Sequence, residues 1–358
     1  MAQRRTKKKL PPLTVGGTEI AAGERATVEV PVPRLYTHTE MAMPVHVLHG
    51  KRPGPRLFVS AAIHGDELNG IEIIRRLLRL PVLDRLRGSL LAVPIVNVHA
   101  CIQRSRYLPD GRDLNRVFPG SERGSLAARM AHVFMTEVVA GSDYGIDLHT
   151  GARHRANLPQ IRAELDHAET LRLAKAFAAP VIMEANVRDG SLRQAVEDTG
   201  VNMLLYEAGE ALRFDETAIR AGVRGVVGVM RAIGMLPRVR ASKHAMEPLL
   251  VQHSTWVRAP SSGILRPTVG LGTRVRKGDT LGYVSDPFGE QEAPVEAQVA
   301  GVVIGRSNLP LVQEGEALFN VGRLEKGSEV QEVLDAFEAV HSDEGETIAP
   351  EEYEPPIV

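Results

Sequence analysis

From about residue 57 the chain alternates short apolar runs with helical patterns, and this alternation restricts its fold more than any other feature. The runs have the length of strands and few polar residues, which is typical of strands covered on both faces. They span residues 57–63, 90–98, 144–148, 181–184 and 203–206. Between them, segments with 3.6-residue periodicity predict helices over 69–80, 124–140, 163–178, 189–198 and 215–234. The pattern predicts an α/β domain with a mixed, mostly parallel sheet flanked by helices.

After about residue 246 the long helical patterns end, and short strands separated by Gly, Pro and Asp replace them. This change predicts a smaller, all-β domain over residues 246–325. The region contains an internal repeat, because Gly263-Ile264-Leu265 is matched later by Gly301-Val302-Val303. Two similar halves favour a β-sandwich or barrel and resemble the biotinyl/lipoyl-like fold. The turn over 285–289 has no lysine, so we expect a covering or oligomerisation module rather than a carrier of a prosthetic group.

The length of 358 residues exceeds what one core of about 250–300 residues usually accommodates, which also favours two domains. The predicted division is a basic N-terminal tail over 1–25, a catalytic α/β domain over 26–245, the β domain, and an acidic C-terminal tail over 326–358. Within the acidic tail, an amphipathic stretch over 329–340 places Val330, Val333, Leu334 and Phe337 on one face. We expect it to form a helix that packs on the β domain.

Composition excludes several classes of protein. No apolar run approaches the roughly 20 residues of a membrane span, and the basic N-terminus is not followed by the apolar stretch of a secretory signal. The chain is therefore expected to be cytoplasmic, with no membrane partner. The single cysteine, Cys101, excludes an internal disulfide and a thiolate zinc cluster, so any metal must be held by His, Asp or Glu. Nucleic-acid binding is not expected, since the basic tail lacks an aromatic platform or a basic helix.

Two predicted strands end in candidate metal ligands. The first ends in His64-x-x-Glu67, and the third ends in Asp147-Leu148-His149. Ligands in α/β sheets gather at such strand ends, and two His plus one Glu form an established zinc-binding set. Asp147 points the same way as His149 along a strand and would orient its imidazole; a purely structural salt bridge is the alternative.

Two further segments carry polar side chains at predicted strand ends. The loop over 106–120 is rich in turn formers and arginines. In it, Asn115 and Arg116 suit a substrate carboxylate, and another arginine could stabilise an oxyanion. Glu207 lies at the end of a strand that should be buried, where it could act as a general base and then acid. Simple solvation of the loop, or a surface ion pair of Glu207, remains the alternative for each segment alone.

Together, the four segments resemble the succinylglutamate desuccinylase/aspartoacylase family, a branch of the zinc carboxypeptidase-like fold. The resemblance covers about residues 55–325 and rests on His64-x-x-Glu67, Asp113-Leu114-Asn115-Arg116, Asp147-Leu148-His149 and Glu207-Ala208-Gly209. It implies one zinc per chain on His64, Glu67 and His149, a substrate carboxylate on Asn115 and Arg116, and Glu207 as general base and acid. Arg106 matches the family's oxyanion arginine, but the loop is slightly longer than in short desuccinylases, so Arg112 stays open for this role.

The sequence therefore predicts a zinc-dependent amidohydrolase acting on a small N-acyl amino acid. A metallocarboxypeptidase with the same chemistry is the nearest alternative, and a non-catalytic binding protein on this fold is another. If residues 246–325 close over the pocket, long peptides cannot enter. A homo-oligomer is compatible with the sequence, although no exposed heptad pattern argues for one.

Overall fold

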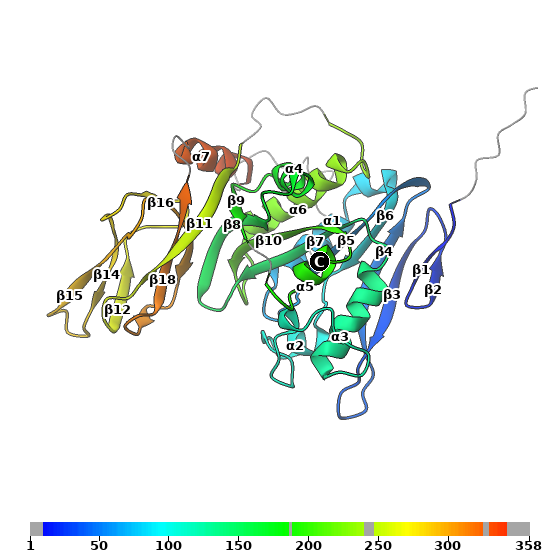
Figure 1. Ribbon diagram of the computed structural model, residues 1–358, viewed down its shortest axis with the longest axis horizontal. Helices are drawn as coiled ribbons and strands as arrows, with labels where there is room; N and C mark the ends of the chain where they lie inside the picture. The colour runs from blue at the N-terminus through cyan, green and yellow to red at the C-terminus, as the bar shows by residue number, and fades with distance from the viewer. Residues whose placement is uncertain (1–9, 186–187, 240–246, 325–328, 342–358) are drawn as a thin grey trace, which may run out of the picture.

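The computed structural model describes residues 10–185, 188–239, 247–324 and 329–341, and a large mixed sheet runs through this part of the chain (Figure 1). Its twelve strands lie side by side in a spatial order that differs from the chain order. That order is β13 (Arg274–Val275), β16 (Gly301–Ser307), β18 (Ala317–Leu324), β11 (Leu249–Arg258), β9 (Val181–Glu184), β8 (Arg155–Ala163), β10 (Asn202–Glu210), β7 (Tyr144–Gly151), β5 (Arg52–Ala61), β6 (Arg87–Val93), β4 (Met41–His49) and β3 (Arg25–Val32).

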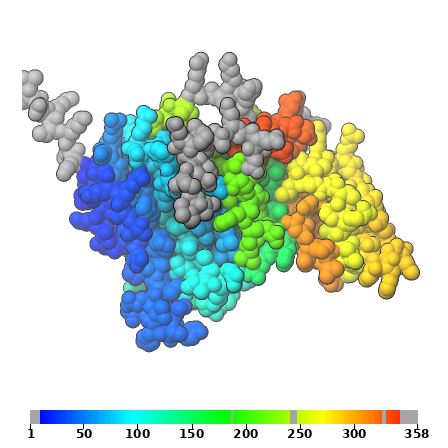
Figure 2. Space-filling model, turned by 180° about the vertical axis from the view of Figure 1, so that it is seen from behind, coloured from blue at the N-terminus to red at the C-terminus, as the bar shows by residue number. Residues whose placement is uncertain are grey.

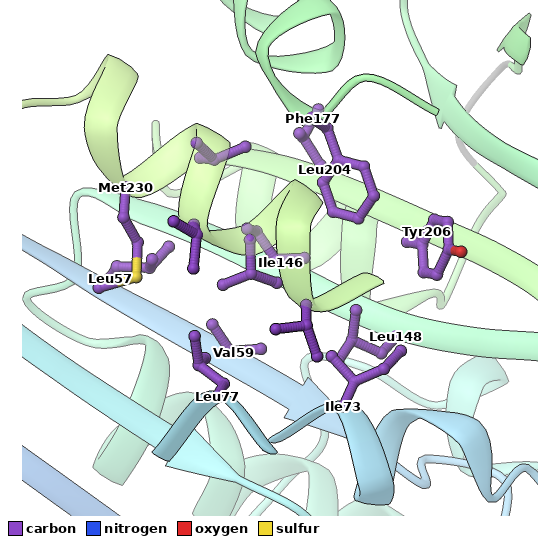
Figure 3. Close-up of a cluster of buried hydrophobic side chains, with 14 of the residues drawn as sticks. Leu57, Val59, Ile73, Leu77, Ile146, Leu148, Phe177, Leu204, Tyr206 and Met230 are labelled. Atoms are coloured by element: carbon purple, nitrogen blue, oxygen red, sulfur yellow. The ribbon is translucent and has the colours of Figure 1, made fainter. Parts of the chain in front are cut away.

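Helices cover both faces of the central strands. One face carries α1 (Asn69–Leu78), α4 (Ala168–Phe177) and α6 (Glu216–Ala232), whose apolar sides form one core with the sheet. Figure 3 shows part of this core, where Ile73 and Leu77 of α1, Phe177 of α4 and Met230 of α6 meet strand residues such as Leu57. The other face carries α2 (Val98–Ile102), α3 (Leu126–Phe134), its π-helical extension Met135–Val139 and α5 (Leu192–Glu197). Short 3₁₀ turns occupy Pro81–Arg85 and Leu114–Arg116. Among the described helices, none is long and apolar enough to span a membrane.

The α/β class is confirmed, with two corrections. Parallel pairing joins β6, β5, β7 and β10, and separately β8, β9 and β11, but antiparallel pairs connect the remaining neighbours. Among the pairs formed by strands β3 to β10, four are parallel and three antiparallel, so the sheet of the α/β region is mixed with parallel pairs in the majority, as predicted. Strand β8 was missed: its sequence contains Pro159 and alternates irregularly, so it shows neither strand nor helix periodicity. The predicted strand over 90–98 is too long, because Val98 already begins α2.

The C-terminal β region shares the large sheet. Strands β11, β13, β16 and β18 belong to it, and a second sheet of β12 (Gly263–Pro267), β14 (Thr280–Ser285), β15 (Glu292–Glu296) and β17 (Leu311–Val312) packs against them. The sequence repeat has a structural counterpart, since β12 pairs with β14 and β17 while β16 pairs with β18 and β13. Strands from both sides of residue 246 share one sheet, and the predicted domain bounds stay a prediction.

The two ends of the described chain are more ordered than simple tails. Within the predicted basic tail, β1 (Leu13–Val15) and β2 (Thr18–Ile20) form a hairpin, and β3 starts at Arg25. Val15 and Ile20 are buried in the core beside β3. Residues 1–9 of that tail lie outside the described part. The N-terminal strands and the C-terminal β region lie at opposite ends of the molecule's long axis (Figure 2).

The amphipathic stretch of the acidic tail forms helix α7 (Val330–His341). Its Val330 and Leu334 pack with strands β9, β11 and β16, as expected for contact with the β region, but Phe337 joins the core under α6. The helix therefore connects the β region to the α/β core. Residues 342–358 of the predicted tail lie outside the described part.

At the end of α7, His341 makes the attachment of this helix sensitive to pH. Burial and the neighbouring Arg224 and Arg220 of α6 lower the pKa of His341 to about 4, and its Nδ1–H donates to the carbonyl of Phe337 at 2.8 Å. In the unfolded chain this pKa is about 6.5, so the folded state favours neutral His341. The packing of α7 is therefore progressively destabilised as pH falls from about 6.5 toward 4. Hydrogen exchange of residues 330–341 should therefore show weaker protection at pH 5 than at pH 7.5 after correction for intrinsic rates. His341→Gln should remove most of this difference; an unchanged difference would refute the assignment.

Candidate metal centre and active site

The predicted ligands lie at the carboxyl ends of neighbouring parallel strands. His64 follows β5, His149 lies within the end of β7, and β5 pairs directly with β7. Glu207 of β10 is the register partner of His149 on the other side of β7. Because the sheet opens at these strand ends, side chains from segments far apart in the sequence converge there.

The turn that carries His64 requires unusual backbone. Ala62 adopts a left-handed conformation with φ of 52°, which is uncommon for a residue with a side chain. Gly65 packs directly against the next loop, because a Cβ atom there would lie 2.1 Å from the carbonyl carbon of Ala100. This close contact fixes the turn that brings His64 and Glu67 to one side.

His64, Glu67 and His149 form a buried cluster with the donor atoms of a metal site. His64 Nδ1 lies 2.6 Å from Glu67 Oε1, and His149 Nδ1 lies 2.8 Å from Glu67 Oε2. One ligand atom from each residue lies within 4.8 Å of the others, and all three residues are buried. Two imidazole nitrogens and a carboxylate oxygen form a set that suits Zn²⁺.

Each imidazole is oriented by a second carboxylate. His149 Nε2 donates to Asp147 Oδ2 at 2.6 Å, and Asp147 Oδ1 accepts from the Ser60 hydroxyl at 2.7 Å. His64 Nε2 donates to Asp113 Oδ1 at 3.3 Å. With both Nε2 atoms held in this way, both Nδ1 atoms face Glu67, which is the arrangement common around protein-bound metals. The orienting role expected for Asp147 matches this geometry.

The charges of the cluster are strongly coupled. Burial alone would raise the pKa of Glu67, but His64 and His149 outweigh it and hold this pKa well below its usual range. Burial would lower the pKa of His149, but Asp147 and Glu67 outweigh it and raise this pKa well above its usual value. Glu67 is therefore held as a carboxylate, the form in which it can bind a cation.

A cavity of about 630 Å³ opens beside this cluster. Glu207 lines it and forms an ion pair with Arg162 of β8. The side chains of Ser254 and Trp256 of β11 and Asn320 of β18 also line it, so the C-terminal β region forms part of its wall.

The structure separates the two arginines that the sequence left open. Arg106 lines the cavity, with its Nη1 3.3 Å from His64 Nδ1 and 3.6 Å from Glu67 Oε1, and it pairs with Asp113 at 2.8 Å. Arg112 is exposed, pairs with Asp110 at 3.3 Å and does not line the cavity.

Asn115 and Arg116 both line the cavity. Asn115 Oδ1 accepts from the backbone N–H of Leu192 at 2.8 Å, which leaves its amide NH₂ to donate to a ligand. Arg116 Nη1 donates to the carbonyl of Asn115 at 2.5 Å. The two neighbouring residues are thus tied together at the edge of the cavity, although their substrate roles remain predictions.

Several residues that line the cavity or contact the metal-ligand cluster had no signal in the sequence. The partner of Glu207, Arg162, lies on the strand that was missed, and Ser60 reaches Asp147 from another strand. Ser254, Trp256 and Asn320 come from the region expected to form a separate domain. Asp113 belonged to a recognised loop motif, but its contact with His64 spans 49 positions and no local pattern predicts it.

These features define a mixed α/β fold with a candidate His-Glu-His metal centre at its strand ends. The sequence profile of the succinylglutamate desuccinylase/aspartoacylase catalytic domain matches residues 53–233. An N-alpha-acetyl-L-2,4-diaminobutyric acid deacetylase from Halomonas elongata is 30% identical over 277 residues, covering 74% of this chain and 81% of the relative. The chain therefore belongs to the succinylglutamate desuccinylase/aspartoacylase family.

Solved structures agree with this placement. A succinylglutamate desuccinylase/aspartoacylase from Rhodobacter sphaeroides matches with a TM-score of 0.74 and 26% identity, covering 84% of this chain and 96% of that chain. The product-bound ectoine utilization protein EutE (DoeB) from Ruegeria pomeroyi matches with a TM-score of 0.74 and 25% identity, covering 83% of this chain and 95% of that chain.

Proposed function

We propose that this protein is a zinc-dependent deacylase that hydrolyses the amide bond of an N-acyl amino acid. The observation that carries the proposal is the convergence of His64, Glu67 and His149 with Arg106 and Glu207 around one cavity, in a chain of this family. The relative from Halomonas elongata, named as a deacetylase of an N-acetyl amino acid, supports the same substrate class.

His64, Glu67 and His149 would hold the zinc ion, one per chain. When bound, the ion supplies Lewis-acid chemistry, which polarises an amide carbonyl and makes water more acidic. Asn115 and Arg116 would bind the substrate carboxylate and fix the amide in the cavity. Glu207 would take a proton from the attacking water and pass it to the amine nitrogen as the C–N bond breaks, which yields a carboxylic acid and an amine.

The wall formed by Ser254, Trp256 and Asn320 favours small substrates over peptides. A metallocarboxypeptidase needs an open path for the rest of a peptide chain, whereas here residues of the C-terminal β region form part of the cavity wall. We therefore favour deacylation over peptide hydrolysis as the activity of this protein. The proposed fold relationship to zinc carboxypeptidases and the cytoplasmic location remain predictions.

The direct test is amine release by the zinc-loaded protein from N-acetyl, N-formyl and N-succinyl amino acids, compared with C-terminal dipeptides and pentapeptides. Zinc content is measured in parallel on the same preparation. We expect one zinc per chain and activity on at least one acyl amino acid, with the pentapeptides not cleaved. Preferred cleavage of pentapeptides would favour the carboxypeptidase, and inactivity with one bound zinc would favour a binding protein.

Arg106 and Arg112 provide a matched pair of arginines for testing the oxyanion role. Arg106→Ala should lower kcat by about 10²-fold, because an oxyanion donor typically contributes this much or more. Arg112→Ala should change kcat less than about twofold, since its side chain is exposed and lies outside the cavity. The test is kcat of both variants on the best acyl amino acid substrate. A larger loss of kcat in Arg112→Ala than in Arg106→Ala would assign the oxyanion role to Arg112.

A further inference from the structure

Five strands close into a ring next to the active site. Strand β8 pairs with β9, β9 with β11, β11 with β18, and β18 with β16. The ring is completed because β16 also pairs with β8. We call this set of strands (β8, β9, β11, β16 and β18) the five-strand ring. It joins two strands of the catalytic region to three of the C-terminal β region.

One end of the five-strand ring is filled. Leu158, Val251 and Ile304 from three of its strands pack together there, and Val330 and Leu334 of α7 cover them. Gly322 of β18 faces the same interior, because a Cβ atom there would lie 2.9 Å from Val251. Asn320 lies two residues earlier on β18, so its side chain points to the same side.

The other end opens into the active-site cavity. Asn157, Gly305, Asn320 and Trp256 are register partners in one row across β8, β16, β18 and β11. Gly305 leaves space between them, since a Cβ atom there would lie 3.0 Å from Asn157 Oδ1 and 3.3 Å from Asn320 Cβ. Asn157, Ser254, Trp256 and Asn320 line the cavity, and we call these four residues the ring mouth.

Asn320 is the unusual member of the ring mouth. The residue is 6% exposed, and within the described part of the chain its Oδ1 has no hydrogen-bond partner. An acceptor withdrawn from water without a partner is unfavourable. A donor group brought into the ring mouth by a ligand would satisfy it. Trp256 supplies an aromatic face beside this acceptor. The guanidinium carbon of Arg155 lies over the indole of Trp256, 5.2 Å from its centroid.

The charges around the cavity restrict what kind of donor fits. Six arginines line the cavity against four carboxylates. They are Arg106, Arg116, Arg155, Arg162, Arg188 and Arg193, against Glu67, Asp147, Glu184 and Glu207. A zinc ion would add further positive charge. An ammonium group is therefore disfavoured, whereas a neutral N–H or O–H group can approach Asn320 without this penalty.

We propose that the ring mouth is a second substrate subsite that binds a neutral hydrogen-bond donor, a primary amide or a hydroxyl, carried by the distal part of the substrate. The inference rests on the proposed deacylase function. It narrows the substrate class to N-acyl amino acids whose side chain or acyl tail ends in such a donor, with the tail lying against Trp256 and donating to Asn320.

Substrate pairs with tails of equal shape test this proposal. In one pair the side chain differs, N-acetyl-L-glutamine against N-acetyl-L-homoleucine; in the other the acyl group differs, N-succinamoyl-L-alanine against N-(4-methylpentanoyl)-L-alanine. We expect the amide member of at least one pair to have the higher kcat/KM. Asn320→Leu should reduce this preference about tenfold to hundredfold, whereas His253→Ala, an exposed position on the same strand β11 as Trp256, should leave it unchanged.

Three outcomes would overturn the proposal. The first two are the absence of a preference for the amide in both pairs and an unchanged preference in Asn320→Leu. The third applies if the side-chain pair shows the preference, and it is faster turnover of N-acetyl-L-lysine or N-acetyl-L-glutamate than of N-acetyl-L-glutamine. In the acyl pair, the corresponding competitors are N-(5-aminopentanoyl)-L-alanine and N-succinyl-L-alanine. Asn320→Ala replaces the leucine variant if circular dichroism shows that the latter is not folded.

A binding measurement separates failure of the subsite from failure of the deacylase function. Trp256 is the single tryptophan of the chain, so its fluorescence reports binding at the ring mouth whether or not the ligand is hydrolysed. In at least one pair, titration with the amide member should shift its emission and give a lower Kd than the apolar member, and Asn320→Leu should remove the difference. A lower Kd for the amide without hydrolysis of any substrate would support the subsite and contradict the deacylase function. Hydrolysis without a difference in Kd would support the deacylase function and contradict the subsite.

Discussion

Glu67→Gln should lose zinc and with it at least about 10³-fold in kcat/KM, because metal Lewis acidity contributes several kcal/mol to such reactions. Both oxygens of Glu67 face an imidazole Nδ1, at 2.6 Å and 2.8 Å. Glutamine removes the negative charge and turns an NH₂ group toward one of these nitrogens. Zinc per chain after dialysis, measured by atomic emission, should fall from one to near zero.

The neighbouring carboxylate provides the control for this variant. Asp66 belongs to the same turn but faces Arg153, at 3.3 Å, and not the two imidazoles. Asp66→Asn should therefore keep one zinc per chain. Thermal unfolding of all three proteins shows whether they are folded. Retention of a full zinc equivalent by folded Glu67→Gln would exclude Glu67 as a ligand.

Glu207→Gln should keep its zinc and lower kcat by about 10²- to 10⁴-fold, the range typical of a lost general base. The glutamine fills the same volume within β10 and can still contact Arg162, so the cavity should keep its shape. What is lost is a group that can accept a proton. Kinetics under substrate saturation isolate this effect from binding.

Glu184 is the matched carboxylate for this test, because it also lines the cavity but accepts the backbone N–H of Leu165 at 3.1 Å. Glu184→Gln should change kcat only a few-fold. A large loss of kcat in Glu184→Gln together with a small loss in Glu207→Gln would assign the proton transfer to Glu184. That result would overturn this part of the mechanism.

The convergence of His64, Glu67 and His149 could be predicted from the sequence because each of these residues lies in a short window at a strand end. His64 and Glu67 are separated by one turn, and Asp147 and His149 by one residue of the same strand face. Apolar runs locate such strands, and the topology of α/β sheets then brings their carboxyl ends together. The prediction needed no knowledge of contacts between distant segments.

The wall of the cavity could not be predicted in the same way. Arg162 meets Glu207 across two strands, and one of these, β8, has a proline and no regular alternation. Asn320 and Trp256 reach the cavity because β11 pairs with β9 and β16 returns to pair with β8. A change in composition near residue 246 indicates new local structure, but it does not say whether the sheet continues across that point.

The same ring of strands has a consequence for cutting or recombining this protein. If the chain ended before residue 247, β9 would lose its partner β11 and β8 would lose β16, which would leave two unpaired strand edges. The apolar side chains of Val181 and Met183, now buried, would become exposed beside them, and such edges promote aggregation. The catalytic region is therefore a poor candidate for a stand-alone fragment. Chimeras between family members should exchange the C-terminal strands together with β8 and β9, so that each ring comes from one parent.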